Sequence, residues 1–359
     1  MKSCHDGNVS ENLQRFHVSN LCALFDFTVY TVAMGTLCSF GLVGNAASFL
    51  VLLRDRGRSA TSFLLQALAF VDSLVLVTAV PLYILPAVYP YTGFLAAYYH
   101  VYLTILPLLW PIYLIPYTCT VIITVLVSLH RYCSVCKPFR QSKVFTCREA
   151  QNRVAGITIF SVIYNIPRFF EYRSVQVCLA PNVSRSAFEI SELGDNKFYR
   201  IIYANVLYFV VIHGGPLLLI TFFNVQLILA LKRRQRRWAE MGKGWYQQDV
   251  SVVLVVVMCV FIVCQTPTFI DHILWTVVGE QARHCGGWHY YYTAIGDLLA
   301  IVNSSVNFVI YILTSRNFRK GLQTQSFGVR NEYVGMHNVG QRQGQRFVTT
   351  STQITINKV

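Results

Sequence analysis

The sequence predicts an all-α membrane protein: a seven-transmembrane helix bundle followed by a short amphipathic eighth helix. Only 13% of the 359 residues are charged and 54% are hydrophobic, whereas a soluble domain carries about 25% charged residues. The stretch from Ser73 to His130 contains no Lys, Arg, Asp or Glu in 58 consecutive residues. Because a helix needs about 20 apolar residues to cross the hydrocarbon core, this stretch alone holds two crossings and a tight connection.

The positive charge lies in alternate connecting segments. A net charge of +14 is compatible with nucleic-acid binding, but the positions of the basic residues argue against it. A combined charge of +17 falls in segments 54–61, 131–153, 232–249 and 314–359. The charges sum to zero over segments 1–26, 87–100, 168–200 and 279–289. Since an excess of Lys and Arg marks the cytoplasmic side, we expect a multi-pass plasma-membrane protein with its N-terminus outside, its C-terminus inside and no nucleic-acid partner.

The pattern divides the chain into an extracellular segment (1–26), the bundle (27–313), an amphipathic interfacial helix (314–322) and a disordered cytoplasmic tail (323–359). The predicted spans are Phe27–Leu53, Ser62–Pro86, Val101–Leu129, Val154–Phe170, Arg200–Leu231, Val250–Val278 and His289–Leu313. In the interfacial helix Phe318 and Leu322 oppose a basic face, as in helices that lie at a membrane surface. The tail is polar and rich in Gly and Gln, a composition typical of disorder.

The outer segments contain candidate modification sites. Asn8 and Asn182 each begin an Asn-Val-Ser triplet, which predicts glycosylation on the outer side. Among the eleven cysteines, those in outer segments, where disulfides form, are Cys4, Cys22, Cys178 and Cys285. If Cys178 is oxidised, its partner is one of the other three, and four cysteines allow three pairings.

Polar residues inside the spans predict function. Asp72 lies in span two, where an ionisable side chain is costly and by default functional; the alternative is a hydrogen bond that only joins two helices. Gly44 and Asn45 lie together in span one, where the alternative is a notch of small residues for close helix packing. Asp271 and Asp297 lie in the outer halves of spans six and seven.

The inner end of span three carries the most specific motif. It reads His130-Arg131-Tyr132 and continues to Val135 and Pro138. With Asp72 and the run Asn303 to Tyr311, this motif resembles the rhodopsin-like (class A) G-protein-coupled receptors, whose third span ends in an acid, Arg and Tyr. The resemblance implies a heterotrimeric G protein as partner and a coupling switch formed by His130, Arg131, Tyr132, Asp249 and Tyr311.

His130 replaces the acid of that motif, so we expect a weakened restraint on Arg131 and signalling without agonist. The resemblance also implies a regulatory sodium ion near Asp72, in a polar network of Asn45, Asp72, Thr120, Asn303, Ser304 and Asn307. No other cofactor and no metal-binding motif are predicted.

The ends of two spans resemble one branch of that family, the invertebrate FMRFamide receptors. They are Tyr164-Asn165-Ile166-Pro167 at the end of span four and Cys264-Gln265-Thr266-Pro267 within span six. The Pro-rich third span and the run Asn303 to Tyr311 agree with them. The branch implies an extracellular neuropeptide ligand, of the RFamide type. Phosphorylation of the tail run Thr349 to Thr352 would create an anionic docking site for arrestin.

The candidate ligand-binding residues are Tyr113, Tyr117, Tyr208, Phe269, His272, Trp275, Asp271 and Asp297. Gln265, Phe269 and His272 share one face of span six at helical spacing, which indicates either a pocket or core packing. A buried carboxylate needs a positive partner, and an Arg-containing peptide would supply it. Asp297 is the better candidate, because Asp271 lies about 100° from the Gln265 face at 3.6 residues per turn.

Three other classes remain as alternatives. A transporter commonly shows repeated halves with matching Gly and Pro breaks, and the sequence shows no such repeat. An enzyme is disfavoured, because neither HExxH nor GxSxG occurs. A chemosensory receptor for small molecules stays open. Within the family, the absence of lysine between Arg283 and Arg316 excludes a retinal Schiff base, and Tyr113 stands where monoamine receptors have Asp.

Overall fold

The computed structural model describes residues 20–54, 59–137, 146–180, 183–240, 249–277, 282, 284–314, 318–319 and 322. The predicted glycosylation sites Asn8 and Asn182 lie outside these residues, as do Cys4, the tail from residue 323 and most of the predicted interfacial helix. Of that helix, Phe318 is described and is buried.

The first three helical segments follow the predicted spans. The first comprises α2 (Asn20–Asp26), the π-helical stretch η1 (Phe27–Met34) and α3 (Gly35–Leu53), so that it begins seven residues earlier than predicted. The second comprises α4 (Ala60–Ala79), the π-helical η2 (Val80–Ile84) and α5 (Leu85–Thr92), and the third is the 41-residue α6 (Ala96–Cys136). Ser59 caps α4 by accepting the Ser62 amide, and Gly93 ends α5 at a φ of 76°, which glycine adopts without strain.

The remaining segments bring the number of helical segments in the described part of the chain to seven. The fourth is α8 (Cys147–Asn165) with the 3-10 turn η3 (Ile166–Phe170). After a hairpin and the short α9 (Glu192–Asp195), the fifth comprises the π-helical η4 (Tyr199–Leu207) and η5 (Phe209–Gly214) and then α10 (Gly215–Glu240). The sixth is α11 (Asp249–Val277), and the seventh is α13 (Trp288–Ser305) with α14 (Asn307–Thr314).

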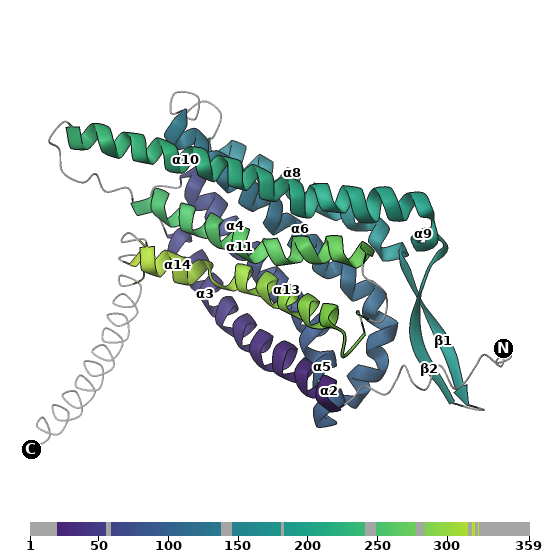
Figure 1. Cartoon of the computed structure of the whole chain (residues 1–359). Helices are drawn as coiled ribbons and strands as arrows, with labels where there is room; N and C mark the ends of the chain where they lie inside the picture. Colours follow the sequence, from purple (N-terminus) through teal and green to yellow (C-terminus); the bar gives the residue numbers. More distant parts are fainter. Residues whose placement is uncertain are drawn as a thin grey trace, which may run out of the picture.

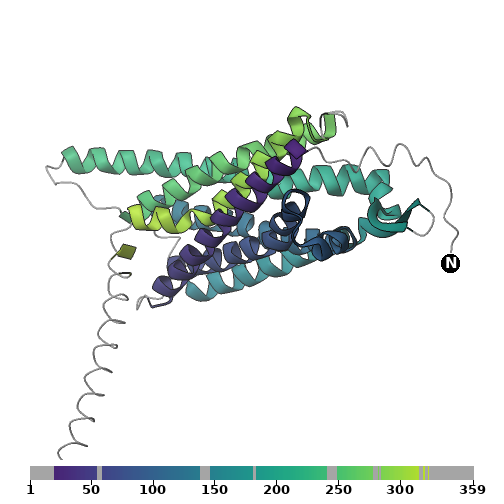
Figure 2. The ribbon, with the colours of Figure 1, turned by 90° about the horizontal axis from the view of Figure 1, so that it is seen from below.

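The helices run side by side in one bundle (Figures 1 and 2), with α10 reaching beyond its neighbours at one end and the hairpin at the other. Within the described residues, four helices are long and apolar enough to cross a membrane, and the bent pair α13 and α14 makes a fifth. In α11 the described stretch Met258–Leu274 is also apolar. Of the apolar window of α6, 67% is buried, against 28% for the fifth helix, so α6 is central and the fifth helix is peripheral.

Two features were not expected from the sequence. The connection after η3 forms an antiparallel hairpin of β1 (Tyr172–Ala180) and β2 (Val183–Ile190), in which Arg173 pairs with Glu189 across the strands. The seventh segment bends by 48° between α13 and α14 although Phe308 stands where a proline would explain a bend. Ser305 accounts for it, because its hydroxyl donates to the carbonyls of Ile301 and Leu37 (2.8 and 3.1 Å), and such back-bonding often bends helices.

The bend is packed against span one. A Cβ on Gly44 would lie 2.7 Å from the Cβ of Phe308, and a Cβ on Gly41 would lie 2.6 Å from the Ser305 hydroxyl. Both glycines therefore permit close contact between the first and seventh helices. This contact brings Asn45 to the seventh helix, where it takes part in the polar network described next.

Candidate functional site

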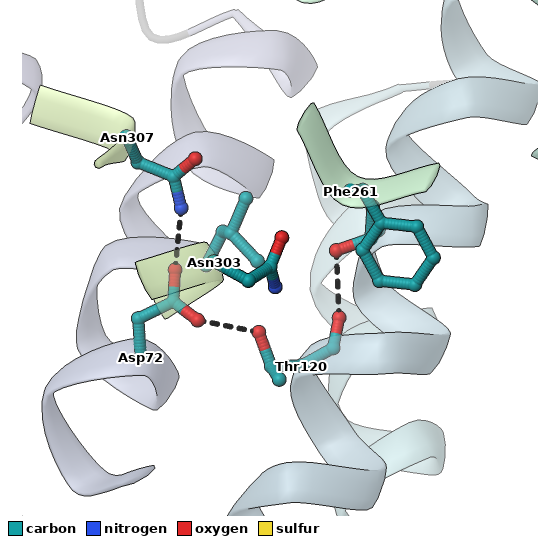
Figure 3. Close-up of a pocket in the computed structure, with 7 residues that line it drawn as sticks. Asp72, Thr120, Phe261, Asn303 and Asn307 are labelled. Atoms are coloured by element: carbon teal, nitrogen blue, oxygen red, sulfur yellow. Dashed lines mark hydrogen bonds between the residues drawn. The ribbon is translucent and has the colours of Figure 1, made fainter. Parts of the chain in front are cut away.

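Asp72 is the centre of a buried polar network in the middle of the bundle. It is fully buried on α4. Its Oδ1 accepts the Thr120 hydroxyl from α6 at 2.6 Å, and its Oδ2 accepts the Asn307 amide from α14 at 2.7 Å (Figure 3). The Ser304 hydroxyl is also within hydrogen-bonding reach. The carboxylate therefore links the second, third and seventh helices.

The six residues predicted to surround a sodium ion fall in this one region. Asn45 donates to the Ser304 carbonyl at 2.8 Å. Asn303 and Asn307 line a small gap beside Asp72, which is closed on the other side by Phe261 (Figure 3). The gap is too narrow for a water-sized sphere. The network is thus assembled, with the donors turned toward the carboxylate.

Asp297 lies in the outer half among tyrosines. Its Oδ2 accepts the Tyr30 hydroxyl at 3.3 Å, and the Tyr83 hydroxyl is also within hydrogen-bonding reach. The rings of Tyr30 and Tyr83 stack with centroids 5.9 Å apart. Asp297 is partly buried, and it forms no ion pair with any described residue. Hydroxyls alone thus hold this carboxylate.

A row of aromatic rings leads inward from Asp297. Tyr83 meets Tyr113 edge to face at 5.5 Å, and Tyr113 stacks on Tyr117 at 5.8 Å. The Tyr117 hydroxyl donates to the Gln265 carbonyl oxygen at 2.9 Å. Tyr113 and Tyr117 are both buried. The row connects helices one, two, three and six.

Asp271 has a different environment. Its Oδ1 accepts the Thr293 hydroxyl at 2.8 Å and lies 3.3 Å from Nε2 of His289, a fully buried residue of the seventh helix. The carboxylate faces α13, on the side expected from the helical period. Asp271 therefore has a partner that becomes cationic on protonation, whereas Asp297 has none among the described residues.

The other predicted ligand residues lie between the fifth and sixth helices. Tyr208 contacts His272 with ring centroids 5.1 Å apart, and Phe269 contacts Phe209 at the same separation. The guanidinium of Arg168 lies 5.0 Å from the Tyr208 ring. Nothing is described of the Trp275 side chain, so its predicted role is untested.

Sequence reasoning missed several partners in the outer half. The sequence does not identify Tyr30 and Tyr83 as candidate site residues, because tyrosines are common in this chain and only the fold places these two beside Asp297. The sequence places Arg168 near the end of predicted span four and gives it no further role. In the structure Arg168 is buried, and its Nη1 lies 2.8 Å from Glu171 Oε2. The available signal was the pair of opposite charges three residues apart at the end of an apolar helix.

The inner end of the bundle holds Arg131. This residue is buried, and its Nε and Nη2 atoms make no hydrogen bond within the described part of the chain. No carboxylate of the described residues forms an ion pair with it. Tyr311 is buried near it and packs on Phe318 with centroids 5.6 Å apart.

The neighbours of Arg131 in the motif are placed differently. His130 is buried, and Tyr132 packs on Phe223 of α10 with centroids 5.5 Å apart. Asp249 begins α11, but its side chain lies outside the described set. The predicted contact between this acid and Arg131 is therefore untested.

The disulfide Cys22–Cys285 joins the start of the first helix to the connection before the seventh. Two of the three partners proposed for Cys178 are therefore excluded, because they are bonded to each other. Cys178 lies in β1 opposite Ser184. Among the outer cysteines this leaves Cys4 as its candidate, and Cys4 is not among the described residues. The elimination could not be made from the sequence, which does not show that the first and seventh helices are neighbours.

Residues 44–311 match the family described as "7 transmembrane receptor (rhodopsin family)". The chain is 30% identical over 298 residues to an FMRFamide receptor of Drosophila melanogaster, covering 82% of this chain and 53% of that protein. It is also 30% identical over 289 residues to an FMRFamide peptide receptor of Caenorhabditis elegans, covering 79% and 65%. A neuromedin-U receptor 1 of Mus musculus is 26% identical over 338 residues, covering 83% and 74%. The chain thus spans about half to two thirds of the length of the two FMRFamide relatives.

Proposed function

The chain belongs to the rhodopsin family of seven-transmembrane receptors, and we propose that it binds an extracellular neuropeptide of the RFamide type and activates a heterotrimeric G protein. The family comprises multi-pass membrane receptors and not enzymes. Two relatives at 30% identity are named as FMRFamide receptors, and the neuromedin-U and galanin receptors among the other relatives also carry the names of peptides.

The observation that carries the proposal is the environment of Asp297. A carboxylate inside a bundle is stabilised by a cation or by several hydrogen bonds. Among the described residues, Asp297 has tyrosine hydroxyls as hydrogen-bond donors and no cation as an ion-pair partner. An arginine side chain binds a carboxylate through two parallel hydrogen bonds. The aromatic residue that follows arginine in an RFamide peptide would pack on rings such as Tyr113 and Tyr117.

The output residue is Arg131. Its guanidinium is buried without a counter-ion among the described residues, which suits a group that is to meet a partner from outside the chain. In this proposal the receptor has two arrangements, and the agonist favours the active one by binding it more tightly. The G protein then contacts Arg131, with Tyr132 and Tyr311 lining the same inner end.

The Asp72 network suits a sodium ion in its chemistry. Asp72, Thr120, Asn303, Ser304 and Asn307 offer oxygen atoms, which hard cations prefer. The gap beside Asp72 is closed by the hydrogen bonds of Thr120 and Asn307. An ion would therefore require these two side chains to turn their oxygens toward it, and would stabilise the arrangement in which they do so.

The proposed orientation places the N-terminus outside and the C-terminus in the cytoplasm. The disulfide Cys22–Cys285 supports it, because disulfides persist in an oxidising space, and it lies at the end of the bundle opposite Arg131. The exposed basic run Lys232 to Arg237 lies at the far end of α10 and agrees with the excess of positive charge on the cytoplasmic side. Arrestin binding to a phosphorylated tail belongs to the same proposal.

The test is a calcium and cAMP screen of cells expressing the full chain against amidated neuropeptides. We expect an agonist ending in Arg-Phe-amide. Asp297→Asn should weaken it by about 100-fold, since losing one partner of a buried charge pair costs about 2–5 kcal/mol. Asp271→Asn should weaken it less, by under about 10-fold, because the Asp271 carboxylate has its own partners in the receptor.

The peptide supplies the matched control. Replacing its arginine by citrulline removes the charge and keeps the shape. This peptide should be about 100-fold weaker on the unchanged receptor and no weaker on Asp297→Asn, since the two changes remove one interaction. Equal affinity of both Asp variants for the parent peptide would refute the charge pairing. A silent peptide panel with a response to odorants would favour a chemosensory receptor, and substrate uptake without G-protein signalling would favour a transporter.

A further inference from the structure

Three aromatic side chains with metal-binding atoms form a triangle between the fifth and sixth helices. His213 and His272 have ring centroids 5.6 Å apart, and Tyr208 lies 5.3 Å from the first and 5.1 Å from the second. Each side of the triangle is thus close to the same length. Tyr208 and His213 come from the π-wound fifth helix, and His272 comes from α11. Such wide turns are frequent at functional sites.

The two imidazoles have nitrogens that are not used in folding. His213 is buried, and its Nδ1 atom forms no hydrogen bond within the described structure. The His272 ring lies close to the backbone of Asn205. A hydrogen bond from one ring nitrogen to that backbone would support metal binding by the other nitrogen, because such a bond fixes the ring and its tautomer.

The spacing of the rings fits one metal ion between them. With zinc–nitrogen bonds of about 2.0–2.1 Å, two imidazoles on one tetrahedral ion have centroids roughly 5 to 5.5 Å apart. The observed 5.6 Å is close to this value. We propose that His213 and His272 bind a zinc ion, or a similar transition-metal cation, that bridges the fifth and sixth helices.

The surrounding charges allow a cation here. Arg168 lies over the Tyr208 ring, but its charge is matched by Glu171 at 2.8 Å. Two charges act on the His272 ring: the positive charge of Arg168 and the negative charge of Asp271, its neighbour on α11. His272 is partly exposed while His213 is buried, so an ion reaches the pair from the His272 side.

Two histidines do not complete the coordination of a metal ion, and this limits the affinity of the site for the ion. No third His, Cys, Asp or Glu joins the pair among the described residues. The Tyr208 phenol and water are left for the other positions, so the ion exchanges and binding is expected in the micromolar range rather than as a permanent structural site. Because the ion ties two helices together, it would favour the arrangement in which the histidines are this close.

The experiment measures thermal unfolding of the purified full-length receptor in detergent, in EDTA and in rising zinc concentration, without any peptide. We expect the midpoint of unfolding to rise with zinc and to saturate, since an ion that binds the folded form stabilises it. Nickel should act similarly and magnesium should not, because imidazole ligands favour the transition metals. The readout is the difference with and without metal, so a variant with altered basal stability is still informative.

Each of His213→Ala and His272→Ala should abolish the zinc-dependent shift, whereas His100→Ala and His284→Ala, on residues outside the triangle, should retain it. Tyr208→Phe should weaken zinc binding a few-fold if the phenol is a ligand. If His213→Ala does not fold, the partly exposed His272 still carries the test. A zinc shift of the same size in the His272 variant, an equal shift with magnesium, or no shift up to millimolar zinc would overturn the proposal. None of these readouts depends on the peptide proposal.

Discussion

Asp72 and Asp297 are both carboxylates inside the bundle, but their surroundings differ. Asp72 is fully buried and accepts hydrogen bonds from the third and seventh helices at 2.6 and 2.7 Å. Asp297 is partly buried, and its hydrogen bond to Tyr30 is long, at 3.3 Å. The first acid is held by short hydrogen bonds from two other helices. The second is held more weakly and has more capacity left for a partner, because an ionised carboxylate can accept about four hydrogen bonds.

Arg131 extends the comparison to the inner end. Like Asp297, it is a charge without a counter-ion among the described residues. The two under-paired groups therefore lie toward opposite ends of the bundle, and Asp72, with its short hydrogen bonds, lies between them. Unpaired buried charge is costly, and its presence near both ends agrees with the proposal that a peptide binds at the outer end and a G protein at the inner end. In this proposal Asp72 chiefly holds helices together, whereas Asp297 and Arg131 bind partners.

The strongest test of this comparison is to replace Asp72 and Asp297 in turn and measure the stability of each variant. Asp72→Leu leaves the Thr120 hydroxyl and the Asn307 amide buried without an acceptor, so it should destabilise the receptor by about 2–4 kcal/mol. The thermal midpoint of the purified protein should then fall by about 5 °C. Asp297→Leu should change it by less than about 2 °C. Equal losses in the two variants would remove the distinction, and Asp72→Asn, which keeps the hydrogen-bonding shape, is the matched control.

Sodium should change agonist affinity through Asp72 and not through Asp297. Replacing choline chloride by sodium chloride should weaken agonist binding by about 5-fold in the unchanged receptor, the lower end of common coupling energies. The effect should disappear in Asp72→Asn and persist in any Asp297 variant that still binds agonist. Radioligand competition at constant ionic strength measures it. Agonist affinity that is insensitive to sodium in the unchanged receptor would contradict the sodium site.

The inner end can be tested by supplying the missing acid. His130→Asp places a carboxylate beside Arg131, so it should restrain the guanidinium and lower agonist-free signalling by about 3-fold, an effect of under 1 kcal/mol on the equilibrium. His130→Asn tests shape without charge and should leave the signal near its original level. The measurement is cAMP or calcium in unstimulated cells at matched surface expression. A basal signal equal to empty vector, unchanged by His130→Asp, would show that no restraint is missing.

The smallest expected effect concerns the hydroxyls around Asp297. Tyr30→Phe removes one donor and keeps the ring stacked on Tyr83, so agonist potency should fall by about 3-fold while stability changes little. The same change in the Asp297→Asn background should have no further effect, because the hydroxyl acts through the carboxylate. A full loss of potency in Tyr30→Phe alone would instead place Tyr30 in direct contact with the agonist.

Much of this protein was determined by sequence alone. The 58 uncharged residues and the alternating basic connections predict several helices in a membrane and their direction. The motif around Arg131 and the acid Asp72 predicts the family, which the match over residues 44–311 confirms. These inferences succeed because hydrophobic length, charge placement and short motifs are local properties of the chain.

The tertiary structure decided which residues meet. Only the fold places Tyr30 and Tyr83 beside Asp297, sets His213 against His272, and joins Cys22 to Cys285. It also bends the seventh helix through Ser305 in the absence of a proline. Nearly all of these contacts join residues far apart in the chain, including the one from Ser305 to Leu37. The rotation and register of one helix against another, which set such contacts, depend on packing over the whole bundle and not on any single span.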